Sequence, residues 1–171
     1  TKKQQAAAPA ENRKKTMADY IKSMSGEIAK ALPKSITPER FTRITLSALS
    51  SNPELQQCTP SSFLAAMMTA AQLGVEPNTP LGQAYLIPYF NGRKQAKECQ
   101  FQIGYKGLID LAYRSGEVQS IQAHEVHLND EFSYSFGLEP ELHHVPAIRD
   151  RGEVIAYYAV WKGKDGGYGF E

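Results

Sequence analysis

Residues 99–116 read CQFQIGYKGLIDLAYRSG and pass from a strand into a short helix. Cys99, Phe101 and Ile103 alternate with two glutamines, so the apolar and polar side chains are expected on opposite faces of a strand. Residues 108–115 follow with helical spacing of their apolar side chains and stop at Gly116. This stretch therefore predicts a fold that mixes helices with an antiparallel sheet.

The corner between that strand and helix carries candidate binding chemistry. Gly104 and Gly107 bracket Tyr105 and Lys106, and glycines allow tight turns while the first helical N–H groups are free to meet an anion. The ring would stack on a base and the ammonium would contact a phosphate. The alternative is an ordinary turn, with the tyrosine folded onto the sheet and the lysine in water. Arg114, about two turns after the lysine, would extend a basic track.

Three helices are predicted before the corner. The first covers residues 17–32 behind a Thr16 cap, and Gly26 is expected to bend or split it. Thr-Pro pairs at residues 37–38 and 59–60 open the other two. The third helix is apolar on all sides and ends before Gly74, which is typical of a central helix.

Residues 84–90 and 99–103 are expected to form a β-hairpin whose tip spans residues 91–97. The tip begins with Asn-Gly and carries Arg93, Lys94 and Lys97. These cations suit a finger on a phosphate backbone, although solvated charges are common at loop tips. Further strands are predicted at residues 118–128, 132–136 and 154–161, with a turn at 164–167 leading into 168–171.

The fold class is therefore α+β, with a small antiparallel sheet, a β-hairpin and packed helices. Residues 1–15 are rich in Lys, Gln, Ala and Pro, which predicts a disordered basic arm. Residues 16–171 are expected to form one core domain. The chain stops within a strand-like pattern, so we expect truncation on its C-terminal side.

Charge is distributed unevenly around a net value of +1. Residues 1–50 carry ten Lys and Arg against four Asp and Glu, whereas residues 116–171 carry four against ten. A dipolar chain of this kind can offer a basic surface to a polyanion, or set its acidic end against a neighbour's basic end. No signal peptide or membrane span is predicted. Cys58 and Cys99 could form one disulfide, but two buried thiols are the favoured interpretation, so a cytoplasmic location is expected.

Catalytic machinery is not predicted. The sequence lacks the phosphate-binding loop of ATP motors and the nucleophile motif of hydrolases. His124 and His127 would point to opposite faces of a strand, and the pair His143–His144 has no cysteine nearby in sequence, which argues against a metal site. We expect no enzyme activity and no cofactor, with any role of Mg²⁺ left open.

Several ordered blocks resemble one family. They are LGVEP at 73–77, LGQAYLIP at 81–88, IGYKGLIDLA at 103–112, RSG at 114–116, DEF at 130–132 and FGL at 136–138. Together they resemble the RecT recombinases of phages and prophages, single-strand annealing proteins distantly similar to lambda Beta protein. The resemblance spans roughly residues 17–171. The resemblance implies that family members continue through a helical segment rich in Lys and Arg, and we expect this C-terminal helical part to be missing from the present sequence.

The resemblance implies an ATP-independent recombinase of a bacterial cell, encoded by a phage or prophage. Such proteins bind single-stranded DNA as homo-oligomers, in rings or helical filaments, and anneal it to a complementary strand. They work with a phage 5′→3′ exonuclease. The alternative is an oligomerisation scaffold whose DNA binding resides in the missing segment. A metal-dependent hydrolase using His124, His127 or His143 is a third, weaker hypothesis.

Annealing requires a strand held by its backbone with its bases exposed. We therefore expect Arg93, Lys97, Lys106 and Arg114 to hold phosphates, while Tyr105 stacks on or shapes the strand. Uncharged polar side chains are expected to touch sugars or duplex edges. The predicted DNA-binding residues are Arg93, Lys94, Lys97, Gln100, Gln102, Tyr105, Lys106, Arg114 and Thr79.

Overall fold

The computed structural model describes residues 15–171, which divide between two compact units, residues 15–107 and Leu108–Glu171. Apart from Lys15, the predicted basic arm lies outside the described residues. The described chain is an α+β protein, which confirms the predicted fold class. Its strands form three small antiparallel sheets, of two, three and two strands. Whether residues 16–171 fold as one domain stays a prediction.

The predicted first helix is split into α1 (Met17–Ser23) and α2 (Ser25–Ala31). Thr16 and Asp19 form a capping box at the start of α1, as the sequence predicted for the threonine. The split lies at Met24 and not at Gly26, which is an interior residue of α2. The predicted break in the first helix is therefore present, but it lies two residues before the predicted position.

The Thr-Pro pairs do open the next two helices, α3 (Pro38–Ser51) and α4 (Pro60–Leu73), with the 3₁₀ turn η1 (Pro53–Gln57) between them. Thr37 accepts a hydrogen bond from the Arg40 N–H, whereas the Thr59 hydroxyl binds Ser62 and does not cap its helix. Gly74 ends α4 in the left-handed conformation, with φ of 61°. Among residues 15–171, no helix combines the length and apolar character that a membrane crossing requires.

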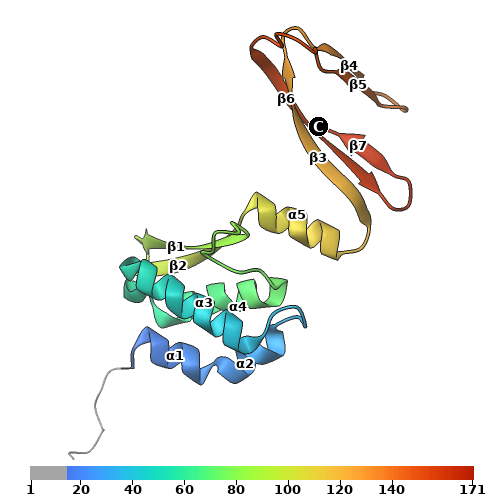
Figure 1. Ribbon diagram of the computed structural model, residues 1–171. Coiled ribbons are helices and arrows are strands. Elements are labelled where there is room, and N and C mark those ends of the chain that lie inside the picture. The colour runs from blue at the N-terminus through green and yellow to red at the C-terminus, as the bar shows by residue number, and fades with distance from the viewer. Residues whose placement is uncertain (1–14) are drawn as a thin grey trace, which may run out of the picture. The chain divides into compact units, whose positions relative to one another are not determined.

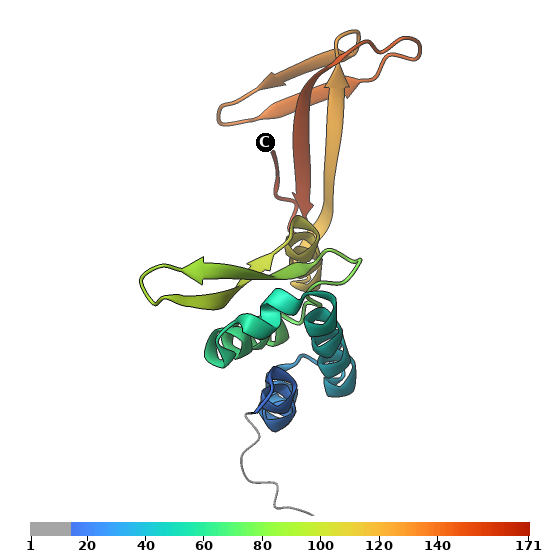
Figure 2. The ribbon, with the colours of Figure 1, turned by 90° about the vertical axis from the view of Figure 1, so that its left-hand side faces the viewer.

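The hairpin consists of β1 (Ala84–Asn91) and β2 (Ala96–Ile103). Figures 1 and 2 show α1–α4 on one side of it. Ala84, Leu86 and Cys99 face these helices and are buried. They join a core whose largest fully buried side chains include Phe41, Phe63, Ile21, Ile28, Leu55 and Met67. One face of the hairpin is therefore fixed on the helices, and the other is open.

Helix α5 (Tyr105–Arg114) begins at the residue after Gly104, so the expected four-residue turn at 104–107 is wrong. The glycines serve close packing instead. A side chain on Gly107 would overlap the Gln83 carbonyl oxygen, and one on Gly104 would lie 2.5 Å from the Gly82 carbonyl oxygen. The Gly104 N–H donates to the Gln83 carbonyl oxygen at 2.8 Å. Residues 104–107 therefore pack closely against the loop that precedes β1.

The second unit holds the remaining strands, which are β3 (Val118–His127), β4 (Glu131–Ser135), β5 (Glu141–Val145), β6 (Val154–Gly163) and β7 (Tyr168–Phe170). They pair antiparallel in the orders β3-β6-β7 and β4-β5. The sequence did not predict β5. Phe132 of β4 stacks on Tyr158 of β6 with ring centroids 5.6 Å apart, and Phe136 stacks on Phe170 at 5.2 Å. Aromatic pairs therefore join the two sheets.

A carboxylate organises the same unit. Asp130 has no exposed side-chain surface and binds Arg151 Nη2 at 2.7 Å, His144 Nε2 at 3.1 Å and the N–H groups of Ala147 and His127. These donors, Arg151 first, hold the pKa of Asp130 well below its ordinary value. The carboxylate therefore ties the loop between β3 and β4 to the loop between β5 and β6.

We expect the Asp130→Asn variant to unfold at a clearly lower denaturant concentration than wild type at pH 7, because Arg151 and His144 lose their shared acceptor. The depressed pKa means that Asp130 stabilises the fold above its unfolded pKa of about 3.9 and that this contribution is lost as the pH falls through the folded value. The gap between variant and wild type should shrink below pH 4. Denaturant unfolding followed by the fluorescence of Trp161, the single tryptophan, measures the two midpoints. Equal midpoints at pH 7 would refute the stabilising role of Asp130.

Candidate nucleic-acid interface

The open face of the hairpin brings amide and aromatic side chains together. Three pairs of opposed residues lie on it, Tyr85 with Gln102, Ile87 with Gln100, and Tyr89 with Glu98. Both glutamines, on β2, are exposed. On β1, Tyr85 is 44% exposed, Ile87 is 38% exposed and Tyr89 is 41% exposed. We call this surface the outward face. It spans five residues of each strand, so at about 3.3 Å per residue it is roughly 16 Å long, enough to follow a few nucleotides of an extended strand.

The sequence predicted the two glutamines and missed the tyrosines. The signal was present, because residues 84–90 alternate in the same way as residues 99–103. Ala84 and Leu86 are buried, so Tyr85 and Tyr89 must point the opposite way.

The tip of the hairpin is shorter than expected, a turn over residues 92–95. Arg93 is exposed and makes no side-chain hydrogen bond or ion pair within residues 15–171. Lys94 instead lies 2.6 Å from the Glu98 carboxylate. Of the two neighbouring cations, Lys94 is therefore paired with an acid, whereas the Arg93 side chain remains available to a phosphate.

Lys97 is a residue of β2 and not of the tip, which corrects the predicted hairpin boundary. Its ammonium lies 3.0 Å from the Gln57 side-chain oxygen and 3.6 Å from the Glu54 carboxylate. It alternates with Glu98 and so points away from the outward face. Lys97 therefore bridges the hairpin to the η1 turn.

Lys106 and Tyr105 lie at the opposite end of the outward face from the tip. The Lys106 stem and the Tyr85 hydroxyl both approach Gly82, where an added Cβ would lie 3.5 and 3.3 Å from them. Lys106 is exposed, and Tyr105 is 69% exposed. The outward face is therefore bounded by Arg93 at the tip and by Lys106 at the base.

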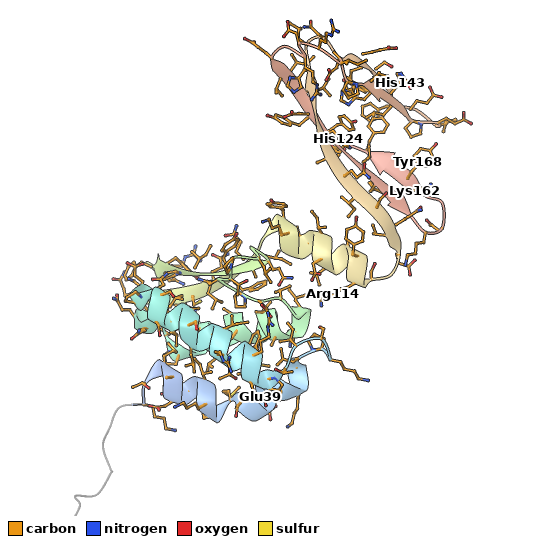
Figure 3. The ribbon with its side chains drawn as sticks, viewed as in Figure 1. Glu39, Arg114, His124, His143, Lys162 and Tyr168 are labelled. Carbon is orange, nitrogen blue, oxygen red and sulfur yellow. The ribbon has the colours of Figure 1, made fainter. Side chains whose placement is uncertain are left out.

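Two further predicted residues make contacts of another kind. Thr79 donates its hydroxyl to the Glu76 carbonyl oxygen and lines a hollow beside Arg40 and Arg43 of α3. Arg114 is the last residue of α5 and belongs to the second unit, where its Nε lies 2.9 Å from Asp110 (Figure 3). Thr79 therefore lies outside the three residue pairs of the outward face.

Two histidines of the described chain make structural contacts, and both cysteines are buried. His127 contacts the Gly152 carbonyl oxygen and Glu125, and His144 lies between Asp130 and Tyr158. His124 and His143 lie in the second unit, on β3 and β5 (Figure 3). Residues 15–171 contain no group of three or more side chains suited to a metal. Cys58 and Cys99 are free and buried, and burial raises the pKa of Cys99 to about 12.

The described chain is a small α+β protein with amide and aromatic side chains on an exposed face of its hairpin. Comparison with known proteins is more specific. The RecT family matches residues 39–171, and Protein RecT of Escherichia coli (strain K12) is 41% identical over 168 residues. The chain belongs to the RecT family.

A second relative is the Uncharacterized protein YqaK of Bacillus subtilis (strain 168), 34% identical over 127 residues. The first alignment covers 96% of this chain and 62% of Protein RecT, and the second covers 73% and 42%. This chain therefore spans less than two thirds of either relative.

Proposed function

We propose that this chain is part of an ATP-independent DNA recombination protein, which binds single-stranded DNA as a homo-oligomer and anneals complementary strands. Membership of the RecT family supports the general activity. The observation that carries the DNA contact is the outward face, with tyrosine and glutamine side chains between Arg93 and Lys106.

The chemistry of this face suits annealing. Cations at its two ends hold phosphates without sequence preference. Tyr85, Tyr89 and Tyr105 offer ring faces to sugars or bases, and base stacking contributes about 1–3 kcal/mol per base. Gln100 and Gln102 supply hydrogen bonds without a charge. No step requires covalent chemistry or a cofactor, so the protein acts as a binding protein and not as an enzyme.

The partners follow from the same proposal. They are a single strand, its complement, further copies of the chain and the phage 5′→3′ exonuclease that makes the single strand, all in the bacterial cytoplasm. Lys97, Thr79 and Arg114 stay predicted contacts, to which the residues described around them give no separate support. The sequence also predicted Lys94 as a contact, but its ammonium lies 2.6 Å from the Glu98 carboxylate.

A scaffold function is the second candidate, and the second unit favours it. Residues 108–171 carry eleven Asp and Glu against five Lys and Arg. Many of the unit's large apolar side chains are exposed, including Ile148, Ile155, Tyr157 and Trp161. An acidic, apolar surface suits a neighbouring copy better than DNA.

Fluorescence anisotropy of a labelled oligothymidylate, titrated with the chain over a salt series, tests the proposal. We expect binding that weakens with salt, with a slope near 0.7 for each phosphate contact. Light scattering on the same samples measures association. Salt-sensitive oligomers without DNA binding would favour the scaffold and contradict the proposed DNA contact of this chain.

A further inference from the structure

An acid lies in the middle of the proposed DNA-binding surface. Glu98 points to the outward face between Tyr89 and Gln100, yet it is only 9% exposed. A bare carboxylate at this position would repel a phosphate backbone. Its burial on an otherwise open face requires an explanation.

Three side chains cover this carboxylate. Lys94 Nζ lies 2.6 Å from Oε1, while Asn91 Nδ2 and the Tyr89 hydroxyl donate to Oε2 at 2.7 and 3.0 Å. We call Tyr89, Asn91, Lys94 and Glu98 the tip cluster. Its donors, Lys94 first, lower the pKa of Glu98 to about 2, so the acid stays ionised at neutral pH.

The tip cluster continues into the backbone of the turn. Asn91 Oδ1 accepts the N–H groups of Arg93 and Lys94 at 3.1 and 3.3 Å, an arrangement typical of an Asx turn. The same asparagine donates its amide group to Glu98. The carboxylate therefore fixes the side chain that shapes the turn on which Arg93 stands.

We propose that Glu98 is a positioning residue that withholds Lys94 from DNA and fixes the turn, so that Arg93 is the cation the tip presents. This inference rests on the proposed function for its DNA part. The ordering of the turn is a property of the hairpin alone and is tested without DNA.

Salt dependence of oligothymidylate binding separates the two cations. We expect Arg93→Met to reduce the slope by about 0.7 and Lys94→Met to leave it unchanged. Glu98→Gln keeps an oxygen for Asn91 and Tyr89 but releases Lys94, so the slope should steepen by up to about 0.7. Glu27→Gln, which removes an acid 2.8 Å from Lys30 of α2, is the matched control. A Lys94→Met slope reduced as much as that of Arg93→Met would overturn the proposal.

Hydrogen exchange of the Arg93 and Lys94 amides tests the turn in the free protein. In Asn91→Ala and Glu98→Ala we expect exchange at least about fivefold faster, the effect of one net hydrogen bond on local opening. Glu27→Gln should exchange like wild type. Unchanged exchange in Glu98→Ala would refute the positioning role, even if Asn91→Ala, which removes the acceptor itself, exchanged faster. If the chain binds no DNA, the assignment of Arg93 fails with the proposed function, and exchange alone decides whether Glu98 orders the turn.

Discussion

The Gly107→Ala variant is expected to lose about 1–3 kcal/mol of unfolding free energy or more, the usual cost of overpacking a close contact. The added methyl group would overlap the Gln83 carbonyl oxygen and approach Ile103 Cγ1 at 3.0 Å. Backbone atoms cannot swing away as a flexible side chain does, so α5 or the loop before β1 must shift. Thermal unfolding followed by far-UV circular dichroism measures the loss.

Gly26→Ala is the matched control, because it makes the same change within another helix. Nothing lies within 4 Å of a Cβ added to Gly26 in α2. That variant should be more stable than wild type, by up to about 1 kcal/mol, since alanine favours a helix over glycine. If both variants shifted stability in the same direction, close packing at Gly107 would not be the reason for its glycine.

The double variant Arg93→Met, Lys106→Met is expected to bind single-stranded DNA at least about tenfold more weakly at moderate salt, since each charge-assisted contact contributes about 1 kcal/mol or more. These residues bound the outward face at its tip and base. The slope of log affinity against log salt should fall by about 1.4, two contacts at about 0.7 each. Fluorescence anisotropy measures both quantities.

Lys34→Met is the control for that pair of substitutions. Lys34 is an exposed lysine of the same unit, in the connection between α2 and α3. It should leave the salt slope within error of wild type. A control variant that weakened binding as much as the double variant would mean that net charge, and not the outward face, governs the contact.

Local signals predicted most of the first unit. Capping threonines, prolines at the first helical position and Gly74 fixed the helix boundaries because they act within one turn. Alternation placed Gln100 and Gln102 on an exposed face, and the structure agrees. The same rule applied to β1 would have found Tyr85 and Tyr89.

The missed features depend on contacts across the chain. Gly107 marks a close approach to Gln83, a residue 24 positions away, and this contact allows α5 to begin at Tyr105. The sequence predicted the same DNA-binding role for Lys94 and Arg93. It could not separate them, because the hydrogen bonds around Glu98 form only when the hairpin closes. Asp130 accepts hydrogen bonds from residues as far along the chain as Arg151. No local pattern in the sequence carries that information.

Sequential annealing tests the central claim most directly. A fluorescent single strand is bound by the chain at low salt, its unlabelled complement is then added without ATP, and pairing is followed by fluorescence. The account predicts capture of the complement faster than spontaneous annealing, with the double variant Arg93→Met, Lys106→Met slower than Lys34→Met. Binding of the first strand with no acceleration of pairing would contradict annealing as the function of this chain.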